Sequence, residues 1–173
     1  MKIIIDKREK NSLIASELIS LGAQIEFKHL LIADYIISKD IAIERKTLND
    51  FISSMINKRI IFQLKDMKKN FKKPILLIEG MDEKDLYKPF KHPKINANAV
   101  KGMILSIITD FQIPIIFSRD SQDSASYIFL LAKKELKEKR PFSLKLKRTP
   151  FNLREQQEII VESFPGIGPS LSK

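Results

Sequence analysis

Short apolar runs rich in β-branched residues alternate along this chain with segments in which apolar residues recur at helical spacing. The runs predicted as strands are 2–5, 25–31, 35–38, 41–45, 75–79 and 113–117. The segments predicted as helices are 13–21, 48–57, 60–71, 95–111 and 121–139, with a surface loop over 81–94. Such alternation predicts an α/β fold with a mixed central sheet flanked by helices. Short polar turns between the second, third and fourth strands predict that these three form a meander.

One of the predicted strands ends in a charged tripeptide, Glu44-Arg45-Lys46. Because side chains alternate along a strand, Glu44 and Lys46 should share one face while Arg45 points to the other. Asp34 begins the preceding strand, and a hairpin through 38–40 would bring it beside Glu44. Two carboxylates and an ammonium in one place indicate a site for a hard cation and a phosphate.

Structural interpretations compete with this one. A Glu-Arg-Lys tripeptide is usually a solvated surface element. The apolar run before it, the carboxylate of Asp34 at hairpin distance and the helix start after it favour a functional role here. Asp50, three residues after Thr47, could simply complete a capping box at the start of a helix.

The segment from Ile32 to Asp50 resembles the XPF family of nucleases, whose motif is Gly-Asp, then Glu-Arg-Lys and an Asp four positions after the Lys. Ala33 stands where the family has Gly, a change that leaves the Asp34 carboxylate in place. Segments 6–9, 74–80 and 113–118 are also similar to that family. The resemblance implies a restriction-endonuclease-like fold over residues 1–140. Phe164–Pro169 is similar to the hairpin of a helix-hairpin-helix element, so 141–152 is interpreted as a basic linker and 153–173 as an incomplete helix-hairpin-helix element.

By this resemblance, Asp34 and Glu44 would bind Mg²⁺ or Mn²⁺, with Asp6 as a further acidic contributor. Lys46 would orient water or stabilise charge on the phosphate, and Arg45 would fix the surrounding carboxylates. Asp50 belongs to the same motif, and Arg8 and Glu9 are predicted to form an outer ring.

Charge and composition narrow the partners. The net charge is +10, from 31 Lys and Arg against 21 Asp and Glu, which favours a polyanion such as nucleic acid. Absence of Cys excludes disulfides and thiol nucleophiles. No apolar run is long enough to span a bilayer and no signal peptide is recognised, so we expect an intracellular protein. Candidate DNA-binding residues are Lys68, Lys69 and Lys72 on one helix and Gly166, Ile167 and Gly168 in the hairpin.

The last two predicted helices are apolar on more than one face, which indicates a homodimer. A sliding clamp and a separate helicase are further candidate partners. The predicted function is cleavage of branched DNA, such as flaps, forks and junctions, in DNA repair or replication-fork processing. The alternatives are a Holliday-junction resolvase and a catalytically silent DNA-binding scaffold of the same fold.

Overall fold

A computed structural model describes residues 1–80, 97–137 and 157. The chain divides into two compact units, 1–139 and 140–173. The predicted loop 81–94, the basic linker and the helix-hairpin-helix segment with Gly166, Ile167 and Gly168 lie outside the described residues. All described residues except 157 belong to the first unit.

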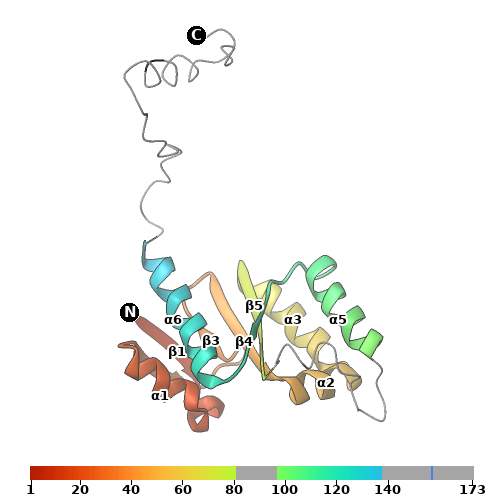
Figure 1. Ribbon diagram of the computed structural model, residues 1–173, viewed down its shortest axis with the longest axis horizontal. Helices are drawn as coiled ribbons and strands as arrows, with labels where there is room; N and C mark the ends of the chain where they lie inside the picture. Colours follow the sequence, from red (N-terminus) through yellow and green to blue (C-terminus); the bar gives the residue numbers. More distant parts are fainter. Residues whose placement is uncertain (81–96, 138–156, 158–173) are drawn as a thin grey trace. The chain divides into compact units, whose positions relative to one another are not determined.

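A six-stranded sheet forms the centre of this unit (Figure 1). Its strands are β1 (Lys2–Asp6), β2 (Gln24–Lys28), β3 (Tyr35–Ile36), β4 (Ile41–Thr47), β5 (Lys73–Glu79) and β6 (Ile115–Ser118), in the order β2-β1-β3-β4-β5-β6. Strand β3 is antiparallel to both neighbours, and all other pairs are parallel. The predicted mixed sheet is confirmed.

The predicted meander of three consecutive strands is wrong. Strand β2 pairs with β1, in parallel, and β3 lies between β1 and β4. The helix after β1 provides the long crossover that a parallel neighbour needs, whereas the short turn at 38–40 allows an antiparallel hairpin between β3 and β4. The hairpin that carries Asp34 and Glu44 was therefore predicted correctly, but not the place of β2.

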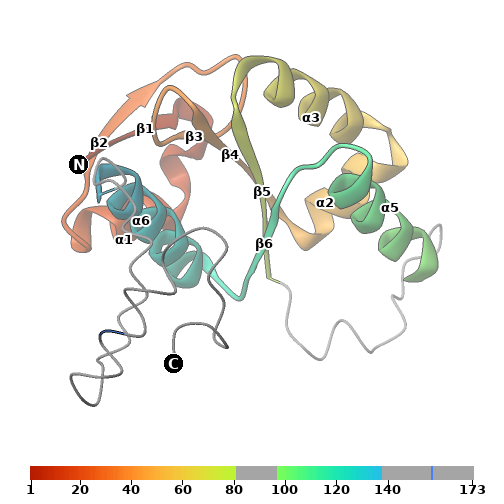
Figure 2. The same cartoon turned by 90° about the horizontal axis from the view of Figure 1, so that it is seen from above.

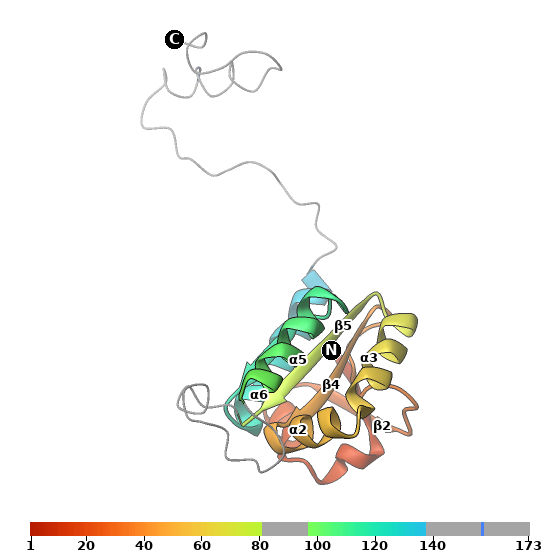
Figure 3. The same cartoon turned by 90° about the vertical axis from the view of Figure 1, so that its right-hand side faces the viewer.

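Helices cover both faces of the sheet. They are the short 3₁₀ helix η1 (Lys7–Asn11), α1 (Leu13–Ser20), α2 (Leu48–Ile56), α3 (Arg59–Asn70), α5 (Ala97–Thr109) and α6 (Ser121–Lys137). Figure 2 shows α1 and α6 together on one side of the sheet and α2, α3 and α5 on the other. The second group lies in front of β4 and β5 in Figure 3. Each layer closes its own apolar cluster against the sheet.

Ala33 adopts a left-handed backbone conformation, with φ of 67°. A residue with a Cβ atom pays about 1 kcal/mol for this conformation, which glycine adopts freely. The Ala33 methyl group is buried in the cluster beneath α2 and α3, and its burial offsets part of that cost. The replacement of the family's glycine is thus a backbone matter, as predicted, but it is not conformationally neutral.

None of the helices in the described ranges is long and apolar enough to cross a membrane.

Candidate active site

The β3–β4 hairpin places Asp34 beside the charged end of β4. The Asp34 backbone N–H donates to the carbonyl of Ile43 at 3.0 Å, and its own carbonyl accepts from the N–H of Asp6 at 2.8 Å. Oδ2 of Asp34 accepts the backbone N–H of Arg45 at 2.9 Å. Hydrogen bonds therefore fix both the main chain and the side chain of Asp34, and the side chain is held next to Arg45.

Glu44 and Lys46 lie together on one face of β4, as the strand period predicts. Nζ of Lys46 donates to Oε1 of Glu44 at 3.1 Å, and the two residues are only 4% and 5% exposed. Helix α3 adds a residue that sequence reasoning missed, because Nε2 of Gln63 donates to the same Oε1 at 2.6 Å. A buried carboxylate is thus held by one cation and one amide.

Asp34, Glu44 and Gln63 open onto a cavity of about 100 Å³. Its lining consists of Arg8, Leu31, Ile32, Ala33, Asp34, Glu44, Gln63 and Asp66. Among the described residues, nothing donates to the second oxygen of Glu44, Oε2, or of Asp34, Oδ1. Neither oxygen is sealed from solvent. Each carboxylate is therefore fixed through one oxygen and leaves the other one available.

The charge of Asp34 is disfavoured in the absence of a cation. Its burial and the neighbouring charge of Glu44 raise the pKa of Asp34 to about 7, although the N–H of Arg45 acts in the opposite direction. Two carboxylates that crowd one cavity repel each other until a proton or a cation binds between them. The site is thus electrostatically prepared for a cation.

The donor set fits a small hard cation. Mg²⁺ and Mn²⁺ prefer oxygen ligands, and Mg²⁺ commonly uses one or two carboxylates while keeping several waters. In the part of the chain that the structure describes, no three acidic or imidazole side chains converge on one point. Asp34 and Glu44 are the two carboxylates that line the cavity from the motif, and Asp66 of α3 lines it as well.

Asp6, predicted as a further metal contributor, has other partners. Oδ1 accepts from the backbone N–H and the Nε of Arg8, at 2.8 and 2.6 Å, and Oδ2 accepts from the N–H of Leu30 at 2.6 Å. Burial opposes ionisation, but these hydrogen bonds outweigh it and lower the pKa of Asp6 to about 2. The contacts favour a structural role, in which Asp6 starts η1 and fastens the loop before Ala33.

Arg8 and Glu9, the predicted outer ring, contact different parts of the site. Arg8 lines the cavity. Its hydrogen bond to Asp6 raises the pKa of its guanidinium against the effect of burial, and the charges of Asp34 and Glu44 add to that increase. Glu9 instead accepts from the hydroxyl of Tyr35 at 2.8 Å and lies 3.5 Å from Nη1 of Arg45. Only Arg8 is therefore placed at the cavity itself.

Arg45 points to the opposite face of β4 and joins a buried polar network. Its guanidinium pairs with Glu79 at the end of β5, through Nη2 and through Nε at 3.2 Å. Burial opposes its charge, but the pairs with Glu79 and Glu9 outweigh that cost and raise the pKa of Arg45. Ser124 of α6 donates to Glu79 at 2.7 Å and shares a hydrogen bond with Ser118 of β6. Arg45 thus connects β4 with η1, β5 and α6.

Asp50 takes part in the cap of α2. The Thr47 side chain accepts the N–H of Asp50 at 3.2 Å and donates to its carboxylate at 2.7 Å. These contacts agree with the structural interpretation, in which Asp50 completes a capping arrangement at the start of the helix. None of the hydrogen bonds or ion pairs between described residues joins Asp50 to Lys46.

Of the candidate DNA-binding lysines, Lys68 and Lys69 lie in the last turn of α3, whereas Lys72, predicted on the same helix, follows its end at Asn70. Lys68 donates to the carbonyl of Phe111 at 2.7 Å, and Lys72 lies 3.5 Å from Asp40. Lys69 is exposed. Their contact with DNA remains a prediction.

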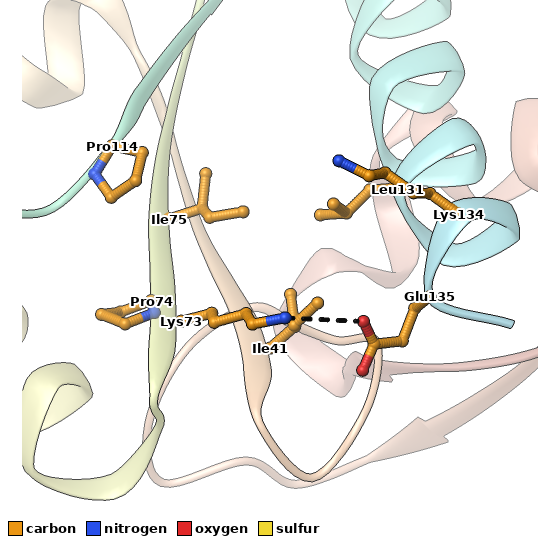
Figure 4. Close-up of a pocket in the computed structure, with 8 residues that line it drawn as sticks. All are labelled: Ile41, Lys73, Pro74, Ile75, Pro114, Leu131, Lys134 and Glu135. Carbon is orange, nitrogen blue, oxygen red and sulfur yellow. Dashed lines mark ion pairs between the residues drawn. The ribbon is translucent and has the colours of Figure 1, made fainter. Parts of the chain in front are cut away.

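A second cavity, of about 220 Å³, lies at the other end of β5 (Figure 4). Ile75 and Leu131 project toward it from β5 and α6, and Lys73 and Glu135 form an ion pair of 4.0 Å at its rim. Ile41, which lines this cavity, pairs with Lys73, whereas Glu44 pairs with Leu76, so three residues, roughly 10 Å of strand, separate Ile41 from the motif. None of the predicted site residues lines it.

Gln63 is the most important residue that sequence reasoning missed. Residues Ile60, Leu64 and Met67 form the buried stripe of α3, and Gln63 lies next to that stripe. A polar residue beside an apolar helical face was the available signal. Its partner, however, belongs to a strand 19 positions earlier.

Comparisons with known proteins agree with this geometry. A family model described as "ERCC4 domain" matches residues 5–131. The chain is 34% identical over its full length to "3'-flap repair endonuclease Xpf" of Saccharolobus solfataricus, of which it covers 73%. It is 42% identical over its full length to "Putative ATP-dependent RNA helicase MJ1505" of Methanocaldococcus jannaschii, but it spans only 21% of that protein.

A solved structure resembles the fold as well. It is described as "XPF from Aeropyrum pernix, complex with DNA", and it matches with a TM-score of 0.71 at 27% identity over 99% of this chain and 78% of that one. The family model covers the motif strand, the cavity and most of α6. This chain therefore carries an ERCC4 domain and belongs to the XPF family of nucleases.

Proposed function

We propose that this chain is the nuclease part of a metal-dependent, structure-specific endonuclease that cleaves branched DNA in repair or replication-fork processing. The main support for this proposal is the cavity lined by Asp34 and Glu44, beside the buried Lys46. Each carboxylate has one oxygen, Oδ1 of Asp34 and Oε2 of Glu44, that accepts no hydrogen bond from the described residues. The name of the Saccharolobus relative and the DNA in the Aeropyrum structure support the choice of substrate. A DNA substrate implies action inside the cell.

In this proposal Asp34 and Glu44 hold the divalent cation, and Lys46 and Arg45 act around them. A bound Mg²⁺ or Mn²⁺ would polarise the scissile phosphate and lower the pKa of a water. Lys46 orients Glu44 and places a positive charge where the phosphate gains negative charge. Arg45 keeps β4 in register with Glu79 and so holds Glu44 in place from the opposite face.

The direct test is a cleavage assay on 3′-flap, fork, four-way-junction and linear duplex DNA of matched sequence, with and without Mg²⁺. We expect cuts near the branch point of flaps and forks, only with Mg²⁺ present. Preferential, symmetric resolution of the four-way junction would favour a resolvase instead. Binding without any cleavage would favour a silent scaffold, which the assembly of Asp34, Glu44 and Lys46 argues against.

We also propose that the chain forms a homodimer through a surface made by α5, α6 and β6. Leu105 and Ile108 of α5 are exposed, although Val100 and Ile107 of the same helix are buried. The α6 side chains Ala125, Ile128 and Ala132 pack into the core. Tyr127 and Leu130 of α6 and Phe117 of the last strand β6 remain exposed.

This pattern calls for a second partner. Both helices use one apolar face to cover the sheet and present another to solvent, which is the arrangement predicted from the sequence. Strand β6 is hydrogen-bonded only to β5 within the described residues, so its outer edge lies between the two exposed faces. A second copy of the chain would cover all three elements at once.

Substitution of Leu130 by Glu should convert the dimer to a monomer, because a charge would replace a side chain that is 57% exposed at the centre of this surface. Light scattering at tens of micromolar, a range suited to contacts of about micromolar affinity, measures the change. The control is Leu13→Glu on α1, a leucine that is 67% exposed and lies outside the surface, which should leave the dimer intact. A wild-type monomer at this concentration would refute the proposal.

A further inference from the structure

Among the described residues, Gln63 makes the hydrogen bond that joins α3 to the motif on β4. Its Nε2 lies 2.6 Å from Oε1 of Glu44, and that oxygen also accepts from Lys46 at 3.1 Å. Two donors from different elements therefore converge on a single oxygen. A carboxylate with one oxygen held in this way has its side-chain torsions fixed, and the direction of its second oxygen is fixed with them.

The orientation of the Gln63 amide is also determined. If the amide were turned over, its oxygen would face the Glu44 oxygen at 2.6 Å, and two acceptors would repel each other. The amide nitrogen must therefore face Glu44, so the amide oxygen points elsewhere. That oxygen is buried and has no hydrogen-bond partner among the described residues.

Gln63 lines the same cavity as the available oxygens of Asp34 and Glu44. Its volume of about 100 Å³ is enough for water, which needs only ~10–15 Å³ and a few polar partners. The amide oxygen itself is buried away from water, so Gln63 keeps an acceptor that is unpaired within the described part of the chain next to the site.

We propose that Gln63 is a positioning residue of the active site. Together with Lys46 it holds Oε1 of Glu44 and leaves Oε2 for the cation. The inference rests on the proposed function, since it assigns Gln63 a role toward the divalent cation at Asp34 and Glu44. It adds a ligand-orienting group from outside the motif.

The first test compares Gln63→Met, which keeps the length of the side chain but removes both polar atoms, with Gln24→Met on the exposed edge strand β2. Mn²⁺ binding is measured by calorimetry without DNA, and the Tm is measured in chelator. We expect Mn²⁺ affinity of Gln63→Met to fall about 10- to 100-fold, as for other groups that orient metal ligands. Its Tm in chelator should change little, because loss of the hydrogen bond to Glu44 is offset by removal of an unpaired buried oxygen. Gln24→Met should change neither quantity.

The result separates the inference from the function on which it rests. Wild-type protein that binds no Mn²⁺ would overturn both. Wild-type binding that is lost in Glu44→Gln but unchanged in Gln63→Met would overturn the role of Gln63 alone. A lower Tm with unchanged Mn²⁺ affinity would likewise show that Gln63 only supports the fold.

If Gln63→Met does not fold, a second variant, Gln63→Glu, tests the same inference. Gln63→Glu keeps the shape and the acceptor, but it adds a carboxylate beside Glu44. In chelator its Tm should fall below that of wild type through repulsion, and saturating Mn²⁺ should raise its Tm by more than it raises that of wild type. An Mn²⁺-induced increase equal to that of wild type would overturn the inference.

Discussion

Replacement of Glu44 by Gln, or of Asp34 by Asn, should reduce cleavage of branched DNA by at least about 10³-fold while DNA binding survives. Each change removes a charged oxygen ligand and almost no volume. Loss of the several kcal/mol that a bound cation contributes corresponds to a rate loss of this size. Binding should persist because it depends on the net charge of +10, which either substitution makes more positive.

Paired gel-shift and single-turnover cleavage assays on a 3′-flap substrate measure the two effects. Glu17→Gln on α1 is the matched control, since it makes the same chemical change outside the cavity and should cleave like wild type. Cleavage near the wild-type rate by both site variants would remove Asp34 and Glu44 from the mechanism.

Asp34→Asn should also make the metal-free protein more stable, and more so as the pH rises. The pKa of Asp34 is about 7 in the folded chain, against an ordinary value of 3.8. A carboxyl group whose pKa is raised by folding gives its full contribution to stability below the unfolded pKa, and that contribution is lost as the pH rises through the folded pKa. Above pH 7 the folded protein must hold a charged Asp34 beside Glu44. An amide at this position avoids that cost, and its oxygen can still accept the N–H of Arg45.

The stability advantage of Asp34→Asn should grow by about 2–3 kcal/mol between pH 5 and pH 8, since each pKa unit is worth about 1.4 kcal/mol. Thermal unfolding in chelator measures it, and the difference corresponds to a Tm change of several degrees. Asp110→Asn, at an exposed aspartate, should show no such growth. Mg²⁺ should raise the Tm of wild type but not that of Asp34→Asn. A constant advantage at pH 5 and pH 8 would contradict the assigned pKa.

Taken together, the two expectations make Asp34 a residue that stabilises the fold less than a neutral substitute would. Evolution retains such residues where function requires them. The same substitution should therefore abolish activity and raise stability, a combination that a purely structural aspartate would not show.

Local periodicity was enough to predict the core of the site. The alternation of side chains along β4 placed Glu44 with Lys46 and Arg45 on the other face, and the short turn at 38–40 brought Asp34 to Glu44. Thr47 was recognised as a cap from its position before an apolar helix. These features depend on residues close in sequence, where backbone geometry leaves few choices.

Only the tertiary structure decided which distant groups complete the site. The position of β2 beside β1, the contact of Gln63 with Glu44 and the pairing of Arg45 with Glu79 all join segments that the sequence separates. The family resemblance implied Asp6 as a further metal contributor, yet both of its oxygens accept hydrogen bonds from Arg8 and Leu30. Periodicity shows which face of an element a side chain occupies, but its partner depends on strand order and helix packing. Those are set by burial of the whole apolar surface, which is not a property of any one segment.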